Sequence, residues 1–166
     1  MKAVAPLLVL GWGNLSRGDD ALGVLLVQQL EQDAAALVSC GGLECLIDHQ
    51  LQVEHALDLA QRQRVLFVDA APGLAGPFEV RTVQPRPGRT PFTHALEPAA
   101  LLDVAQRQLG LALPVAQLLA LRAQTFELGQ PPSPAGMAAL QAARAWALRW
   151  VHAQAAAWPA GSRGSV

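Results

Sequence analysis

An apolar run that ends in a glycine turn and two carboxylates most constrains the fold of this chain. Residues 8–24 read LVLGWGNLSRGDDALGV. A continuous apolar run with β-branched members is typical of a strand covered on both faces, and the apolar residues after Asp19 and Asp20 recur at helical spacing. The stretch therefore predicts a strand, a tight turn and a helix, and open α/β sheets place their ligand crevice where such a strand ends.

The same alternation of strand and helix patterns continues along the chain. Strands are expected over Pro6–Gly11, Leu43–Asp48, Arg64–Ala70, Phe78–Val83 and Val115–Ala123, and helices over Asp19–Gln32, Val53–Gln61, Glu97–Leu109 and Ser133–Ala156. The periodicity of residues 115–123 would also permit a helix. The link at 70–77 is too short for a helical crossover, so the strand after it is expected to run antiparallel. We predict an α/β fold, a three-layer α/β/α sandwich with a mostly parallel five-stranded sheet and one antiparallel strand.

Length and composition favour one soluble domain. The chain has 166 residues, 52% of them hydrophobic, and a formal net charge of -1. This composition excludes a disordered chain and gives no sign of a basic nucleic-acid-binding face. We expect a single domain over residues 1–157 and a flexible tail over 158–166.

No targeting or membrane segment is expected from the sequence. The apolar start MKAVAPLLVLGWGN leads into a glycine turn rather than a small-residue cleavage site, which favours a first strand over a signal peptide. No apolar run reaches the roughly 18 residues of a membrane helix. The two cysteines, Cys40 and Cys45, are too few for a disulfide scaffold and favour reduced thiols in the cytoplasm.

Three side chains near the ends of predicted strands and helices could together form a metal site. Asp20 lies just beyond the first strand, Asp69 ends the third, and His94 precedes the helix near Glu97. The C-terminal ends of neighbouring parallel strands meet at one edge, so the two aspartates could converge. A helix N-terminus favours the neutral imidazole, which is the form that binds metals. Two carboxylates and one imidazole suit nickel, zinc or a similar divalent ion with open positions.

Spacing alone leaves simpler interpretations open. Asp19, or Gly18, fits the N-cap of the first helix, and Asp20 would also be a favourable first-turn charge. Asp69 is harder to explain in this way, because a carboxylate at the end of a buried run is costly to desolvate without a partner. It could still cap a loop, and a loop histidine such as His94 is commonly a surface residue.

Other kinds of site find less support. The glycines at 11, 13 and 18 resemble a dinucleotide loop, but Ser16 breaks the spacing and the two aspartates would repel a pyrophosphate. No G-x-S-x-G elbow is present, and neither cysteine has the setting of a nucleophile. The remaining histidines, His49, His55 and His152, lack ligand spacing, and His152 is expected to be exposed on a helix. Three acids are expected at the surface: Glu44, Asp48 and Asp58.

With these positions in view, the chain resembles the hydrogenase maturation endopeptidases, which trim a C-terminal peptide from the large subunit of nickel-iron hydrogenases. The resemblance spans residues 6–150 and rests on four segments in order: GWGNLSRGDDALGV, RVLFVDA, TPFTHALEPAALL, and QTFELG followed by SPAGMAALQAA. Ala21 departs from the glycine common after the acids. The segment LIDHQLQVEHALDLAQ is similar to the branch associated with soluble NAD-linked hydrogenases.

The resemblance implies a function and a ligand set. The family's metal-binding residues fall on Asp20, Asp69 and His94, and they would bind nickel that arrives with the substrate, with no organic cofactor. The partner would be a hydrogenase large-subunit precursor, with neither nucleic acid nor membrane involved and the oligomeric state open. Trp12 and Asn14 would shape the crevice, and the loop at 85–93 would contact the substrate's tail. The alternatives are a nickel-binding chaperone without protease activity, a nucleotide-binding module, or a purely structural interaction protein.

Overall fold

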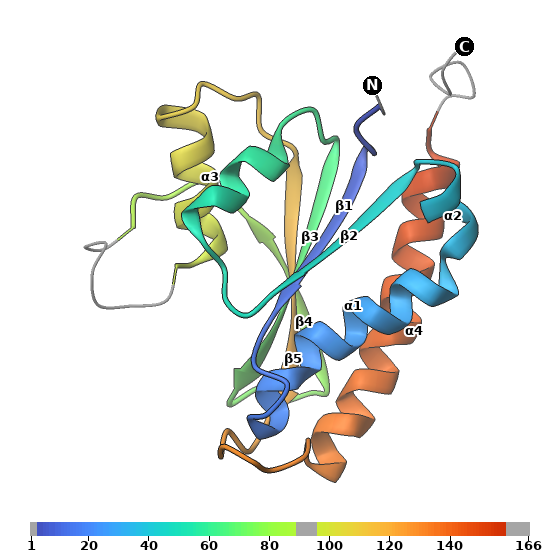
Figure 1. Ribbon diagram of the computed structural model, residues 1–166, viewed down its shortest axis with the longest axis vertical. Coiled ribbons are helices and arrows are strands. Elements are labelled where there is room, and N and C mark those ends of the chain that lie inside the picture. Colours follow the sequence, from blue (N-terminus) through green and yellow to red (C-terminus); the bar gives the residue numbers. More distant parts are fainter. Residues whose placement is uncertain (1–2, 89–95, 159–166) are drawn as a thin grey trace.

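Strands and helices alternate along the chain, as the hydrophobic pattern predicts. The computed structural model describes residues 3–88 and 96–158. The strands of this part are β1 (Leu7–Trp12), β2 (Leu43–Asp48), β3 (Arg64–Pro72), β4 (Phe78–Val83) and β5 (Val115–Ala123). Its helices are the 3₁₀ turns η1 (Gly18–Ala21) and η2 (Val53–Leu59) and the α-helices α1 (Leu22–Asp33), α2 (Ala35–Ser39), α3 (Pro98–Arg107) and α4 (Pro134–Ala156) (Figure 1).

The strands form one mixed sheet in the order β2-β1-β3-β5-β4. β1 pairs in parallel with β2 and β3, β3 pairs in parallel with β5, and β4 runs antiparallel to β5. The predicted mostly parallel sheet with one antiparallel strand is confirmed. β5 separates β3 from β4, so the antiparallel strand pairs with the last strand rather than with its neighbour in sequence. Residues 115–123 form the strand, not the alternative helix.

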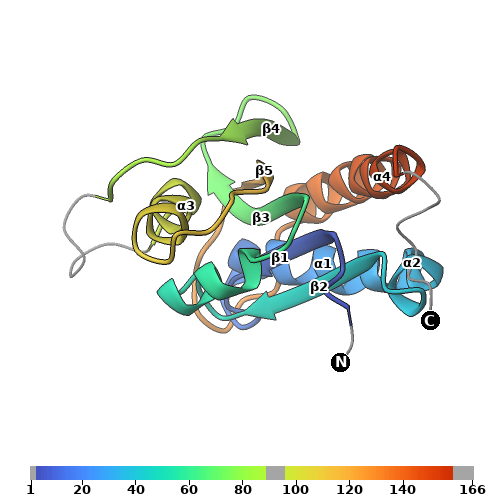
Figure 2. The same cartoon turned by 90° about the horizontal axis from the view of Figure 1, so that it is seen from above.

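Helices cover both faces of the sheet and make the three layers visible in Figures 1 and 2. On one face, α1 and α4 pack on alternate strand residues such as Leu7 and Val9. On the other face, α3 and η2 pack on the intervening residues such as Leu8 and Leu10. Side chains alternate across a strand, so a run that is apolar throughout satisfies both cores at once.

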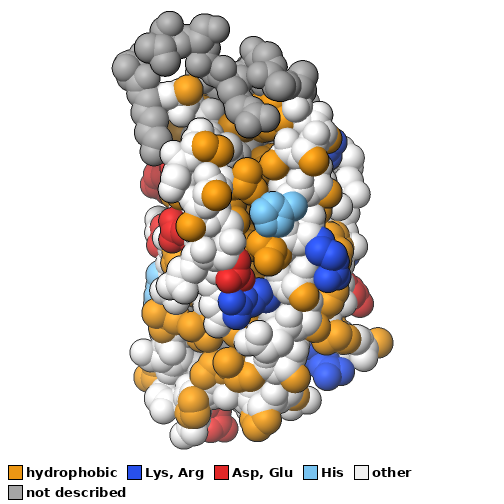
Figure 3. Space-filling view, turned by 90° about the vertical axis from the view of Figure 1, so that its right-hand side faces the viewer, with side chains coloured by type: hydrophobic (Ala, Val, Ile, Leu, Met, Phe, Trp, Pro, Cys, Tyr) orange, Lys and Arg blue, Asp and Glu red, His pale blue; other side chains and the backbone are white. Residues whose placement is uncertain are grey.

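The solvent side of α1 and α4 carries few charges. Figure 3 shows this face, where the Lys, Arg, Asp and Glu side chains lie scattered among hydrophobic and neutral atoms. On the described part of this face no basic patch gathers, in keeping with the near-neutral net charge. None of the described helices combines the length and the hydropathy that crossing a bilayer requires.

The helix predicted over 19–32 differs at its start. The chain first forms the 3₁₀ turn η1 and enters α1 only at Leu22, and no side chain caps either element. Residues 53–59 likewise form a 3₁₀ helix, and the short helix α2 was not predicted. The last helix agrees with the prediction, since the Ser133 side chain accepts a hydrogen bond from the Gly136 amide at 2.9 Å and Pro134 follows the cap. The predicted domain and tail bounds remain predictions, and residues 159–166 lie outside the described part.

Candidate active site

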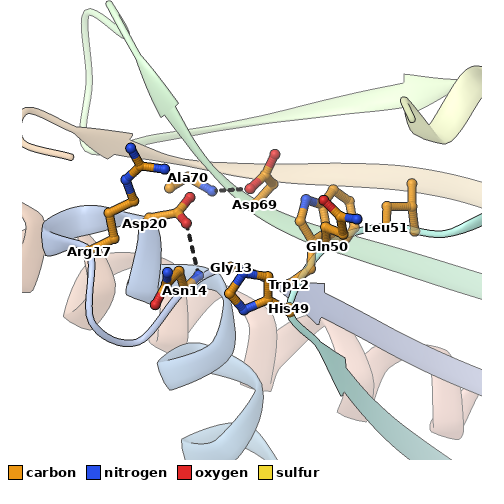
Figure 4. A pocket seen from close by; sticks show the side chains of 10 residues that line it. All are labelled: Trp12, Gly13, Asn14, Arg17, Asp20, His49, Gln50, Leu51, Asp69 and Ala70. Atoms are coloured by element: carbon orange, nitrogen blue, oxygen red, sulfur yellow. Dashed lines mark hydrogen bonds between the residues drawn. The ribbon is translucent and has the colours of Figure 1, made fainter. Parts of the chain in front are cut away.

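A cavity of about 260 Å³ opens at the C-terminal ends of β1, β2 and β3. Residues of these strands and of the segments that follow them line it: Trp12, Gly13, Asn14, Arg17, Asp20, His49, Gln50, Leu51, Asp69 and Ala70 (Figure 4). The cavity therefore lies where the ligand crevice of an open α/β sheet is expected. Trp12 and Asn14 shape its wall, as predicted.

The structure brings Asp20 and Asp69 to the same cavity. Asp20 comes from η1, after the glycine turn, and its Oδ2 accepts a hydrogen bond from the Asn14 amide at 2.8 Å. Asp69 is the first residue of β3 beyond the ladder with β1, which ends where Gly11 pairs with Val68. Its Oδ1 accepts from the Ala70 amide at 2.8 Å. Figure 4 shows the two carboxylates on neighbouring walls of one pocket.

Two glycines allow this close arrangement. Gly13 has φ of 145°, and a Cβ there would lie 1.9 Å from the Asp20 carbonyl oxygen. A Cβ at Gly23 would lie 2.8 Å from the carbonyl oxygen of Val68, the residue before Asp69. The turn can therefore fold back on η1, and the start of α1 can approach β3, only without side chains at these positions. The glycines of the opening motif serve the packing around the carboxylates.

Asp69 is unusual among the carboxylates because its pKa is raised far above the ordinary value. Desolvation raises the pKa of Asp69 to about 7, and the charge of Asp20 adds to the rise. The hydrogen bonds from the Ala70 amide and the Trp12 side chain act in the opposite direction but do not outweigh burial. A carboxyl group that titrates near neutral pH in a cavity is typical of a catalytic or ligand-binding site.

This pKa makes the stability of the fold depend on pH. The native state holds the Asp69 proton up to about pH 7, whereas the unfolded chain releases it near pH 3.8. Stability therefore falls as the pH rises through this window and is level above it. We expect Asp69→Asn to remove this fall, so that at pH 8 the variant is more stable than the unchanged chain, by at most about 4 kcal/mol. Urea unfolding of both proteins between pH 4 and pH 8 measures the difference, and a difference independent of pH would contradict the assignment.

The prediction that Asp19 caps the first helix is wrong. Asp19 is fully buried, and its carboxylate instead accepts hydrogen bonds from distant groups. These are the backbone amides of Gln124 at 2.7 Å, Thr125 at 3.2 Å and Ser133 at 2.6 Å, and the Ser133 hydroxyl at 2.7 Å. Burial raises the pKa of Asp19, but these hydrogen bonds outweigh it and hold the pKa below its ordinary value. Asp19 is a structural carboxylate.

The Asp19 contacts join the glycine turn to the loop between β5 and α4. The Asp19 amide donates to the Thr125 carbonyl at 2.8 Å, and the Gly18 amide donates to the Gln130 carbonyl at 2.9 Å. Arg17 adds a bond from its Nε to the Phe126 carbonyl at 3.0 Å. Adjacent aspartates thus point in different directions, one into the structure and the other toward the cavity.

The third predicted ligand, His94, lies outside the described residues. Within residues 3–88 and 96–158, no three His, Cys, Asp or Glu side chains form a group that could hold a metal ion. Asp20 and Asp69 are thus two members of a predicted set whose third member the structure does not describe. The predicted contact loop at 85–93 is also only partly described.

Sequence reasoning missed part of the cavity wall. His49, Gln50 and Leu51 line the cavity directly after β2, and Arg17 brings a cation to it from the glycine turn. His49 was not predicted as a site residue, because it has no ligand spacing to another histidine. Its position immediately after a predicted parallel strand was the available signal.

Two acids expected at the surface hold partners along β2. His55 Nε2 lies 3.1 Å from Asp48 Oδ2, and Arg62 pairs with Glu44.

The Cys45 thiol is free, and burial raises its pKa to about 12, so it is a poor nucleophile.

Solved structures share this fold. A [NiFe] hydrogenase maturation protease HycI from Thermococcus kodakarensis KOD1 superposes with a TM-score of 0.68 at 22% identity, covering 89% of this chain and 93% of its own. The fold is that of the hydrogenase maturation proteases. The hydrogenase maturating endopeptidase HybD from E. coli gives a TM-score of 0.67 at 22% identity over 89% and 93% of the two chains. A hydrogenase 2 maturation peptidase from Thaumarchaeota archaeon SCGC_AB-539-E09 gives 0.62 at 19% identity over 87% and 97%.

The likeness lies in the fold rather than in overall sequence. No family model matches the sequence, and no curated protein matches it either. The shared fold covers 89% of this chain, although only 22% of the aligned residues are identical.

Proposed function

We propose that this chain is an endopeptidase that removes the C-terminal extension from the nickel-loaded large-subunit precursor of a nickel-iron hydrogenase. One observation carries the proposal. Asp20 and Asp69, which the family resemblance implies as metal ligands, line the same cavity at the strand ends of a maturation-protease fold.

The chemistry of the cavity suits recognition of a substrate metal. Asp20 and Asp69 offer carboxylate oxygens, and His94 would add an imidazole nitrogen, a mixed set that suits nickel. Three protein ligands leave positions open for groups that the precursor itself contributes. The nickel is thus part of the substrate, and it places the bond to be cleaved beside the carboxylates.

Water is the nucleophile in this proposal. It adds to the carbonyl carbon of the peptide bond, its proton passes to a carboxylate, and the carboxylate returns a proton to the leaving amine. The pKa of about 7 suits Asp69 to hold and release such a proton near neutral pH. Polarisation of the water by the substrate's nickel is the alternative means of activation.

Incubation of the purified chain with nickel-loaded and nickel-free precursors, followed by mass spectrometry, tests the function. The proposal expects the loss of a C-terminal peptide from the nickel-loaded precursor only. Binding of the precursor without any change in its mass would favour a nickel chaperone instead. Cleavage of both forms at the same rate would exclude recognition through nickel.

Replacing His94 should affect the same reaction. We expect His94→Ala to reduce cleavage of the nickel-loaded precursor by roughly 10²-fold or more, because one ligand of the substrate metal is lost and even the outer-shell partners of metal ligands contribute about 10- to 100-fold. His152→Ala is the matched control, since His152 is exposed on α4 and far along the chain from the cavity-lining segments. Normal cleavage by His94→Ala would show that this histidine is not a ligand.

The hydrogenase served is proposed from the segment around β2. Its similarity to the branch for soluble NAD-linked hydrogenases favours the large subunit of such an enzyme. Precursors from NAD-linked and membrane-bound hydrogenases, offered together, would compare the two, and preferential cleavage of the membrane-bound type would contradict this finer proposal.

A nucleotide-binding module fits the structure less well. The Asn14 amide, which a phosphate would need, already donates to Asp20. The space that a phosphate would need beside Gly13 holds the Asp20 backbone. A carboxylate at the mouth of the glycine turn would repel the ligand that such a module binds.

A further inference from the structure

The strand that leads into the cavity is also an open edge of the sheet. β2 lies first in the strand order, with β1 on one side. Figure 1 shows β2 at the front of the sheet, and Figure 2 shows α1 and α2 beside it on one face rather than across its outer edge. An edge strand presents unpaired backbone groups that can pair with another extended chain.

The ladder shows which groups of β2 point outward. The Asp48 carbonyl accepts from the Gly13 amide at 3.2 Å, and the Gly42 carbonyl accepts from the Leu7 amide at 3.3 Å. Alternate residues of a parallel strand face the same neighbour, so the residues between them, including Cys45 and Ile47, point their amides and carbonyls away from β1. No described residue bonds to the outward backbone groups of these two.

β2 lacks the features that usually protect an edge. It contains no proline, lysine or glycine, and its sequence is LECLID. Both of its carboxylates are held by partners, Glu44 by Arg62 and Asp48 by His55. Natural edges are commonly blocked by free charges, prolines or bulges, so an edge without them is suited to pair with a chain.

The β2 edge is continuous with the cavity, whereas the opposite edge is not. His49, Gln50 and Leu51 follow β2 directly and line the cavity, while no residue of β4 does. A peptide that leaves the cavity past these residues therefore meets the outer side of β2 first. The edge spans six residues, about 20 Å of extended chain.

We propose that the C-terminal extension of the substrate pairs with β2 as an added antiparallel strand. This inference rests on the proposed function. In the precursor, the nickel-bearing domain precedes the cleaved bond and the C-terminal extension follows it. When the cleaved bond lies at the carboxylates, the extension therefore begins beside the C-terminal end of β2. It then runs toward the N-terminal end of β2, which is the antiparallel direction. Backbone pairing binds an extended peptide with little demand on its sequence. The part that is discarded thus holds the precursor in place.

A proline at Ile47 tests the pairing. Its amide points outward near the cavity and its side chain is 41% exposed, so Ile47→Pro removes one outward donor without breaking a bond to β1. We expect Ile47→Pro to raise KM for the nickel-loaded precursor about tenfold with kcat little changed, while Ile47→Val behaves as the unchanged chain. Thr82→Pro is the control on the other edge. The Pro77 carbonyl accepts from the Arg122 amide, so Thr82 points away from β5.

Amide exchange gives a second measurement that needs no proline. We expect the amide protons of Cys45 and Ile47 to become protected when the inactive Asp20→Asn variant is saturated with nickel-loaded precursor, and those of Val80 and Thr82 to stay unchanged. Equal KM for the Pro and Val variants, or unprotected β2 amides in the complex, overturns the edge pairing while the cleavage itself still stands. If the unchanged chain cleaves no precursor, the proposed function fails and the pairing with it.

Discussion

Asp20→Asn and Asp69→Asn are each expected to reduce cleavage of the nickel-loaded precursor by roughly 10²- to 10⁴-fold. Each change keeps the shape of the side chain but removes the charge that would bind the substrate metal or take a proton from water. The fold should persist, because each carboxylate accepts a single backbone hydrogen bond, Asp20 from the Asn14 amide and Asp69 from the Ala70 amide. Mass spectrometry of the precursor measures the rate, and circular dichroism checks the fold.

Asp103→Asn is the matched control for these two variants. Asp103 is a carboxylate on α3 that pairs with Arg107 one helical turn away and does not line the cavity. We expect it to cleave at the normal rate. Normal cleavage by Asp20→Asn as well would remove the chemical basis of the proposed site.

Asp19→Ala is expected to lower the stability of the fold rather than to change the chemistry of cleavage. The change leaves the backbone amides of Gln124, Thr125 and Ser133 without their carboxylate acceptor. Hydrogen bonds to a charged group contribute about 1.5–3 kcal/mol, so we expect Asp19→Ala to lower the unfolding free energy on the order of 3 kcal/mol. Urea unfolding at pH 7 measures this loss for Asp19→Ala beside Asp20→Ala.

The comparison between these neighbours is the sharpest part of this prediction. Asp20→Ala should change the unfolding free energy far less than Asp19→Ala, because only the Asn14 amide loses a partner. Equal losses of stability in the two variants would contradict the division between a structural and a functional carboxylate.

The sequence allowed prediction of the features that depend on local pattern. β2 and β5 have the predicted bounds, and α4 begins at the predicted Ser133 cap and Pro134. The convergence of Asp20 and Asp69 was also predictable, because the ends of parallel strands meet at one edge. Each inference needed only apolar periodicity, one cap or the position of an acid after a strand.

The role of Asp19 could not be predicted in this way. Its partners lie 105 to 114 residues away in the sequence, in a loop whose course no local pattern specifies. Locally, an acid before an apolar helix is typical of an N-cap. In the structure, Asp19 lies within the 3₁₀ turn η1, where its side chain caps no helix and bonds to distant residues instead. His49 was missed for a similar reason, since its role depends on which segments meet at the cavity and not on spacing between histidines.

X-ray absorption at the nickel edge tests the central claim most directly. The sample is a nickel-loaded precursor whose cleavage site is blocked by a proline, measured alone and with the unchanged chain or the Asp69→Asn variant. The account predicts that the unchanged chain adds oxygen and nitrogen neighbours to the substrate's nickel and that Asp69→Asn adds fewer. A nickel environment that stays the same when the unchanged chain binds would contradict it.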